Sequence, residues 1–168
     1  RLEVTSGAAS LGGQYRFAAR PSGADVVLRS GELLVTQLAV RDRGEQTDYL
    51  ALDKVTATGL ELSLAEEKAL VGEITVTGGR IQTWLTPDGE LKRSGLFDPM
   101  VGPPAAPAAP QDKGWQVSIP RINLRNLGVS LEDRSLTPAP ALILQPLNLT
   151  IDGYETQPGA TVKIALDA

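Results

Sequence analysis

Few side chains in this 168-residue sequence can do chemistry, because it contains no His and no Cys. Their absence removes imidazole acid–base catalysis, thiol nucleophiles, disulfides and most zinc and iron–sulfur ligands. Pairs of carboxylates remain, and these act as acid and base when their surroundings separate their pKa values. The candidate pairs are Asp42 with Asp133 and Glu66 with Glu67. Each Asp stands beside an Arg after an alternating run, as in a turn cap or a structural ion pair, so we predict that the chain is not an enzyme.

The sequence also predicts no metal ion, no cofactor and no nucleic-acid partner. Asp88-Gly89 resembles part of a calcium loop, but the acidic ligands that such a loop needs do not follow at the required spacing. We therefore interpret this pair as a turn. The formal net charge is −4, whereas a nucleic-acid surface needs a basic face.

Apolar residues recur at every second position through most of the chain, which is the period of a β-strand with one apolar face. The positions between them are mostly polar, as in an antiparallel sheet with one solvated face. The predicted fold class is therefore mainly β, with little helix. The residues that we expect on the apolar face are Leu60, Leu62, Leu64, Ile74, Val76, Ile81, Leu85, Val117, Ile119, Ile122 and Leu124.

Glycine and proline divide the chain. Gly78-Gly79 lies between two alternating runs and predicts a hairpin turn, and Gly12-Gly13 predicts a break between two strands. The segment from Pro99 to Pro110 holds five of the 12 prolines, so it predicts an extended or disordered loop that is dispensable for folding. The predicted organisation is a first β repeat unit at 1–98, a Pro/Ala-rich loop at 99–114 and the start of a second unit at 115–168.

The two predicted units resemble each other. Asp42-Arg43 follows one alternating run and Asp133-Arg134 follows another, 91 positions later, and each is followed by a polar loop and a further alternating run. A repeat of this length suggests stacked β units in which each unit covers its neighbour. The repeat therefore favours an elongated body over a closed barrel.

Three stretches carry a resemblance to a known family: Val71 to Leu91, then Trp115 to Leu124 after the Pro/Ala-rich gap, and Leu131-Glu132-Asp133. Together they resemble the AsmA-like proteins, above all the large repeat-bearing periplasmic branch of the family in Gram-negative bacteria. The resemblance covers roughly residues 30 to 155. It implies an inner-membrane anchor, a periplasmic body of antiparallel β repeats curled into a groove, and a part in outer-membrane assembly or phospholipid movement. No anchor is seen in the sequence, so we interpret it as a piece of a longer chain anchored through a segment outside it.

Two functions fit an aliphatic face without reactive groups. In the first, the face lines a groove that shields phospholipid acyl chains, since methylene burial needs only an apolar wall. In the second, two faces pack together and the chain is a structural scaffold or partner-binding module of the cell envelope. The expected partners are acyl chains and adjoining repeats of the same chain. Trp84 is interpreted as a lipid or partner contact or as a cap on the sheet edge, and Trp115 as an anchor to the core.

Overall fold

The computed structural model describes residues 2–20, 23–89, 115–157 and 159–167, and within these ranges it is all β. The predicted loop at 99–114 lies outside them. The seven strands are β1 (Leu2–Arg20), β2 (Gly23–Asp42), β3 (Leu50–Ser63), β4 (Lys68–Leu85), β5 (Gln116–Asp133), β6 (Ala141–Glu155) and β7 (Lys163–Asp167). The prediction of a mainly β protein is confirmed. The described residues include no helix long and apolar enough to cross a membrane.

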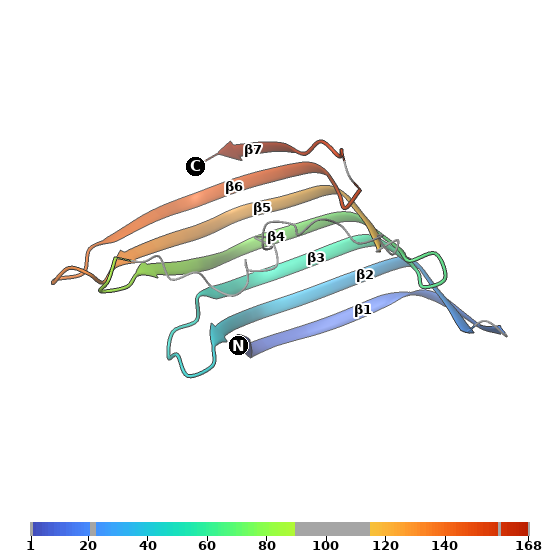
Figure 1. The fold of residues 1–168 in the computed structure, drawn as a ribbon, viewed down its shortest axis with the longest axis horizontal. Coiled ribbons are helices and arrows are strands. Elements are labelled where there is room, and N and C mark those ends of the chain that lie inside the picture. The colour runs from blue at the N-terminus through green and yellow to red at the C-terminus, as the bar shows by residue number, and fades with distance from the viewer. Residues whose placement is uncertain (1, 21–22, 90–114, 158, 168) are drawn as a thin grey trace, which may run out of the picture.

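All seven strands form one sheet in chain order, and this sheet is curved and open (Figure 1). Neighbouring strands are antiparallel, except that β4 and β5 run parallel with each residue of β4 opposite the residue 48 positions later. The connection after β3 is a short turn, and Leu64 at its start is exposed. The described strands therefore make a single layer with two faces.

The expected hairpin at Gly78-Gly79 is wrong, because β4 runs straight through both residues. Gly78 has φ 70° and Gly79 has φ 130°, so the pair bends the strand without reversing it. The predicted break at Gly12-Gly13 is also wrong, since β1 is continuous from Leu2 to Arg20. Glycine supplies an unusual φ in both settings, and local sequence does not separate a turn from a bend in a long strand.

Two lines of residues cross the sheet at the levels where several strands take unusual φ values, and we call them the kink rows. The first row consists of Gly7, Gln37, Asp53, Gly78 and Asn126, and the second of Gly13, Gly31, Gly59, Gly72 and Pro120. Left-handed φ values occur in the first row at Gln37 (53°), Gly78 (70°) and Asn126 (55°), and at or beside the second at Gly59 (64°) and Ser30 (50°). On each of β1 to β5 the two kink residues stand six positions apart.

The first kink row changes the phase of side-chain alternation. Leu124 and Leu127 stand three positions apart on β5, yet they pair with Leu149 and Leu147, which stand only two apart on β6. Because direct cross-strand partners share a face, Leu124 and Leu127 point to the same side, with Asn126 absorbing the extra residue. The kink therefore keeps aliphatic residues on one face along the whole strand.

A small buried cluster lies near the end of the sheet where β2 and β4 finish. It contains Val40, Tyr49 and Trp84, with Leu38 and Leu50 packed against it. Trp84 is only 5 % exposed and the Arg134 guanidinium lies 4.2 Å from its ring centre, so it is a core residue and not a lipid or partner contact. Burial, reinforced by the carboxylate of Asp42, raises the pKa of the Tyr49 phenol.

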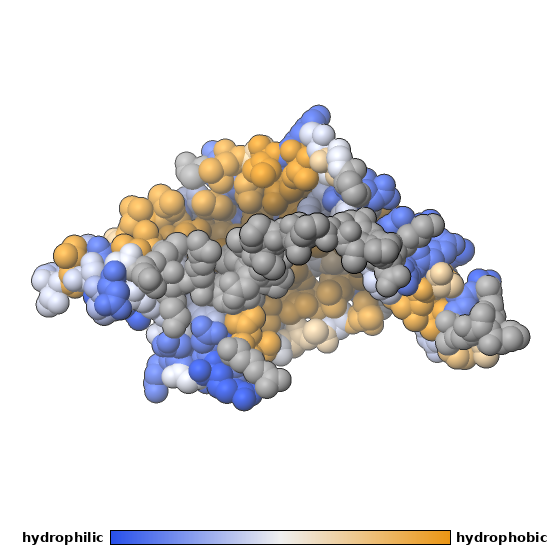
Figure 2. All heavy atoms as spheres, viewed as in Figure 1, coloured by the Kyte–Doolittle hydropathy of each residue, from blue (hydrophilic) through white to orange (hydrophobic). Residues whose placement is uncertain are grey.

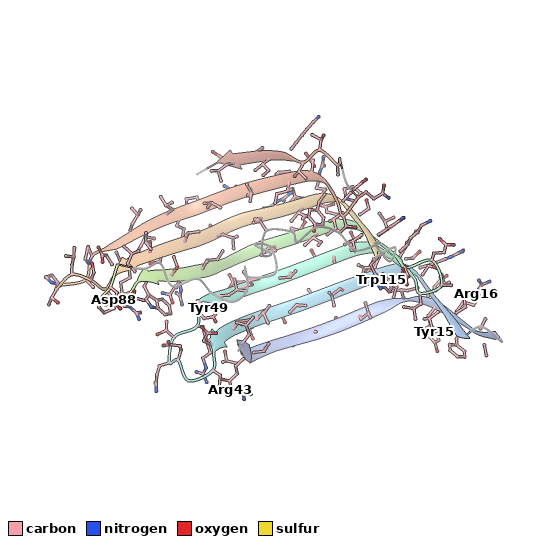
Figure 3. All side chains as sticks on the ribbon, in the orientation of Figure 1. Tyr15, Arg16, Arg43, Tyr49, Asp88 and Trp115 are labelled. Carbon is pink, nitrogen blue, oxygen red and sulfur yellow. The ribbon has the colours of Figure 1, made fainter. Side chains whose placement is uncertain are left out.

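Trp115 does not anchor the chain to the core as the sequence predicted. It is 43 % exposed and lies at the opposite end of the sheet from Tyr49, the end at which Tyr15 and Arg16 also lie (Figure 3). Its carbonyl accepts a hydrogen bond from the Thr156 hydroxyl, which is its described tie to the sheet. The main chain, and not the indole ring, holds this start of β5 in place.

Candidate functional site

One face of the sheet carries two unbroken rows of aliphatic residues, which we call the apolar rows. Each row crosses all seven strands through direct cross-strand partners, which share a face. The first is Leu11–Leu33–Ala57–Ile74–Ile122–Ile151–Ile164, and the second is Ala9–Val35–Val55–Val76–Leu124–Leu149–Leu166. The two rows lie side by side between the kink rows and contain no polar residue.

Further aliphatic residues extend this face beyond the first kink row. Leu38, Leu52, Gly79, Leu127 and Leu147 form the next line of partners. Val40, Leu50, Ile81, Val129 and Leu144 form the line after it. Figure 2 shows orange residues on this hollowed side of the sheet, and the cross-strand partners make the apolar surface continuous from strand to strand.

The apolar face is partly open to solvent in the part of the chain that the structure describes, although Ala57 and Val76 of the apolar rows are buried. All described strands belong to the one sheet, so no second sheet of described residues packs on this face. Ile74, Ile122, Leu124 and Leu149 are only half-buried, and Ile164 and Leu166 are 67 % and 65 % exposed. Contiguous exposed apolar surface is characteristic of places where proteins bind partners or ligands.

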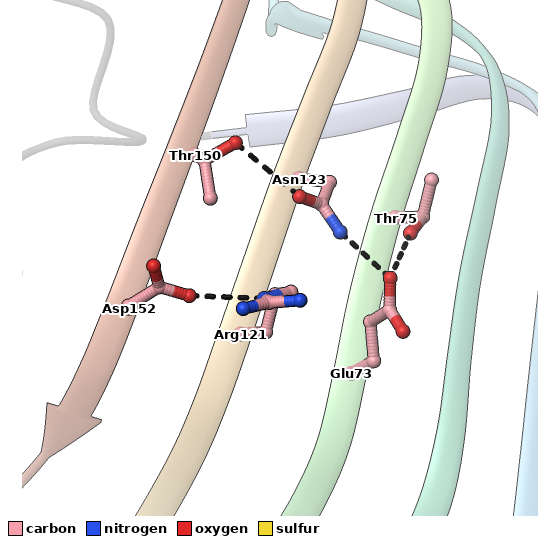
Figure 4. A network of polar contacts seen from close by, with 6 residues as sticks. All are labelled: Glu73, Thr75, Arg121, Asn123, Thr150 and Asp152. Carbon is pink, nitrogen blue, oxygen red and sulfur yellow. Dashed lines mark hydrogen bonds and ion pairs between the residues drawn. The ribbon is translucent and has the colours of Figure 1, made fainter. Parts of the chain in front are cut away.

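The opposite face is polar at the same level of the sheet. Its partner rows are Ser10–Leu34–Thr56–Thr75–Asn123–Thr150–Ala165 and Gly12–Glu32–Thr58–Glu73–Arg121–Asp152–Lys163. Asn123 donates a 2.6 Å hydrogen bond to Glu73 Oε1, which also accepts one from the Thr75 hydroxyl at 3.2 Å (Figure 4). These contacts tie β4 and β5, the parallel pair, together on the solvated side.

Most of the residues predicted on the apolar face do lie there. Ile74, Val76, Ile122 and Leu124 belong to the apolar rows, and Ile81 belongs to the extension beyond them. Leu85 ends β4 in the same alternation as Ile81 and pairs with Asp133. The spacing of two in the sequence therefore predicted the centre of the apolar face.

The other predicted residues lie toward the far end, at or beyond the second kink row. A Cβ built on Gly31 would come within 2.8 Å of Leu60 Cβ, which places Leu60 on the side of Leu33. Leu62 and Val117 both pair with Ala69, and Ile119 pairs with Tyr154. The prediction for Leu64 is not met, because this residue is 41 % exposed in the turn after β3.

A cleft of about 700 Å³ lies at this far end, where Tyr15 and Arg16 are labelled in Figure 3. Leu28, Leu62, Leu70 and Val117 supply its apolar lining. Its charged lining has both signs: Arg16, Arg29 and Lys68 with Asp25, Glu61, Glu66 and Glu155. Lys68 and Glu66 pair at 3.3 Å, so part of this charge is already satisfied within the cleft.

The carboxylate pairs considered for catalysis do not assemble. Asp42 ends β2 and Asp133 ends β5, with β3 and β4 between them. Asp133 Oδ1 accepts a 2.9 Å hydrogen bond from the Ser135 amide, which makes it a turn cap, while Arg134 pairs with Glu132 at 2.7 Å. Glu66 and Glu67 lie in the turn between β3 and β4. Among the described residues no three acidic side chains gather as metal ligands.

A sequence signal for the apolar rows exists and was missed. Each of β1 to β5 reads kink–x–apolar–x–apolar–x–kink, as in Gly72-Glu-Ile-Thr-Val-Thr-Gly78 and Pro120-Arg-Ile-Asn-Leu-Arg-Asn126. The two apolar positions are those of the apolar rows. The spacing of six, repeated five times, would have predicted both the rows and the continuity of each strand.

The polar network predicts a pH-dependent loss of stability in Asn123→Asp. At pH 7 this variant places a second carboxylate beside that of Glu73, at a position that is only 7 % exposed. We expect a loss of about 2 kcal/mol in unfolding free energy. The folded pair holds a proton more tightly than the unfolded chain, so stability should rise as the pH falls below about 5. Urea unfolding at several pH values measures this.

The matched control is the double variant Glu73→Gln with Asn123→Asp. It removes one of the two carboxylates, so most of the loss and its pH dependence should disappear. An Asn123→Asp profile parallel to that of the double variant would contradict the proposed contact between β4 and β5.

No family model, no curated protein and no solved structure matches this chain.

Proposed function

We propose that this chain is a periplasmic segment of an AsmA-like protein, held at the inner membrane by a further segment. In this proposal its apolar face carries lipid acyl chains between the inner and outer membranes, and it contributes to outer-membrane assembly without catalysis or cofactor. The observation that supports the proposal is the pair of apolar rows, which cross every strand on an open, concave surface.

The energetics of the apolar rows suit an acyl chain that moves along the face. Each buried methylene of an acyl chain contributes about 0.8 kcal/mol, without a directional contact. Fourteen aliphatic side chains in two parallel rows give a similar apolar surface at each strand. The binding free energy of an acyl chain therefore changes little when the chain moves by one strand. A fixed ligand site would instead need polar groups placed to hold one orientation.

The openness of the face favours this function over a closed scaffold. A scaffold core would hold its aliphatic residues fully buried, whereas among the apolar rows only Ala57 and Val76 are buried, and Ile164 and Leu166 are about two-thirds exposed. The mixed charges of the end cleft suit a zwitterionic headgroup better than a purely anionic one, because both cations and carboxylates line it.

Photo-crosslinking in cells tests the proposal. A photoreactive amino acid at position 74 in the full protein should give lipid adducts, whereas the same residue at position 75 should give none. Ile74 belongs to an apolar row and Thr75 to the polar face, one residue away on the same strand, so the two variants differ only in the face they report.

Two outcomes would contradict the proposal. Adducts with protein alone at position 74 would favour the scaffold, in which another apolar surface covers the rows. Equal lipid adducts at both positions would show unspecific contact with membrane lipid.

A further inference from the structure

The charged side chains of the end cleft point away from the apolar rows. Much of the lining follows two lines of direct cross-strand partners, which share a face. The two lines are Arg16–Val27–Ser63–Lys68–Gln116 and Glu61–Leu70–Ser118–Glu155. Leu60 lies on the side of Leu33, so Glu61, the next residue of β3, points to the other side. The cleft therefore presents its charges on the side of the sheet opposite the apolar rows.

Two arginines of the cleft lie side by side on neighbouring strands. Arg16 of β1 pairs with Val27 of β2. Arg29 stands two positions beyond Val27, so the two arginines are diagonal neighbours on one face, about 7 to 8 Å apart at the backbone. Both also line a smaller cleft of about 170 Å³, to which Gln14 contributes. Two guanidinium groups can therefore converge on one ligand.

The charges of these two arginines are not balanced by a neighbour. Among the residues that the structure describes, none forms an ion pair with Arg16 or Arg29. Glu66 of the same cleft pairs with Lys68, and Asp25 is only 6 % exposed and already has an interaction of its own. Adjacent guanidinium groups favour an anion between them, and their paired N–H donors match the oxygens of a phosphate.

A carboxylate stands on the next strand. Ser30 has φ 50° and adds an extra residue to β2, so Arg29 and Ser30 together lie opposite Glu61 of β3. Glu61 is exposed and forms no ion pair with any described residue. Neighbouring strands lie about 4.8 Å apart. The cleft therefore offers two cations and, one strand away, a carboxylate.

We propose that this cleft binds a phosphate ester that also carries a primary ammonium group, with the phosphate held by Arg16 and Arg29 and the ammonium by Glu61. Phosphoethanolamine has this chemistry, either as a free molecule or as the headgroup of a lipid. Its two charged groups are joined by two methylenes, which matches the separation of one strand. The cleft of about 700 Å³ has the size of a small-molecule site. The inference goes beyond the proposed function, because the site does not require lipid on the apolar rows.

Isothermal titration calorimetry with phosphoethanolamine tests the two arginines. The chain should bind this probe saturably. The double variant Arg16→Gln with Arg29→Gln should weaken binding by about tenfold or more, because it removes the charge-assisted hydrogen bonds to phosphate. Arg125→Gln is the matched control, since it removes the same charge from an exposed position of β5 outside the cleft and should leave the affinity unchanged.

A comparison with inorganic phosphate tests the carboxylate. The natural chain should bind phosphoethanolamine more tightly than phosphate, and Glu61→Gln should abolish this preference. Equal affinities of the natural chain for the two probes would overturn the proposal. No saturable binding of phosphoethanolamine would also overturn it, as would an unchanged affinity in the double arginine variant.

Vesicles distinguish the two sources of the ligand. Cosedimentation with phosphatidylcholine vesicles that depends on added phosphatidylethanolamine and on both arginines would identify a lipid headgroup. Binding of phosphoethanolamine without such cosedimentation would identify a free phosphate ester. Ile74→Asp should leave the affinity for phosphoethanolamine unchanged, so a failure of this site and a failure of the apolar rows can be told apart.

Discussion

The Ile74→Asp variant should stay folded and lose at least tenfold in affinity for an acyl-chain probe. Ile74 stands at the middle of an apolar row, between Ala57 and Ile122. A carboxylate there keeps contact with water while the face is empty, so its cost to folding is about 1 to 2 kcal/mol. A bound acyl chain would exclude that water, and the ionised group would oppose binding by several kcal/mol.

Binding of a fluorescent fatty acid, with circular dichroism as the check on folding, measures the loss. Thr77→Asp is the control, because it adds the same charge on the polar face of the same strand, at an exposed position between Lys54 and Arg125, and should leave probe affinity unchanged. If Ile74→Asp bound the probe normally in the folded state, acyl chains would not use the apolar rows. If Ile74→Asp unfolded while Thr77→Asp did not, a closed core would replace the open groove.

The second large effect is expected for Gly79→Ala, with a loss of about 3 kcal/mol in unfolding free energy. Gly79 has φ 130°, which L-residues rarely adopt, and an added Cβ would collide with the Ala51 carbonyl oxygen. It would also come within 2.9 Å of Leu52 Cα, so backbone on β3 would have to move. Chemical denaturation of the variant measures the cost.

Gly44→Ala separates the two causes of that loss. Gly44 also has a positive φ, 93°, but no atom would lie within 4 Å of its added Cβ, so only the conformational cost of about 1 kcal/mol should remain. Gly12 has neither a positive φ nor an atom within 4 Å of its added Cβ, so Gly12→Ala should change the unfolding free energy by less than about 0.5 kcal/mol. Equal losses in Gly79→Ala and Gly44→Ala would mean that β3 and β4 separate easily at the first kink row.

The alternation of the sequence was enough to find the apolar face but not its boundaries. Ile74, Val76, Ile122 and Leu124 alternate locally, and strands that alternate must put such residues on one side. Leu64 continues the same spacing in the sequence, but it follows the end of β3 and is exposed. The end of a strand depends on the turn and on the neighbouring strand, which local spacing does not report.

The continuity of β4 depended on information from other strands. Gly78-Gly79 alone fits a hairpin as well as a bend. The bend is favoured because Gln37 and Asn126, at the same level on β2 and β5, also take left-handed φ values. Trp84 was misjudged for a similar reason: Val40 and Tyr49, which bury it, are distant in the sequence.

The six-residue spacing of the kink rows limits how these strands can change in length during evolution. One residue gained or lost between two kinks would carry the aliphatic side chains beyond it to the polar face and set its kink out of line with those of the neighbouring strands. Length variation is therefore expected in the turns, such as that between β2 and β3, where added residues disturb no cross-strand pair. Homologous strands should differ freely in sequence while the distance between their kinks stays fixed at six.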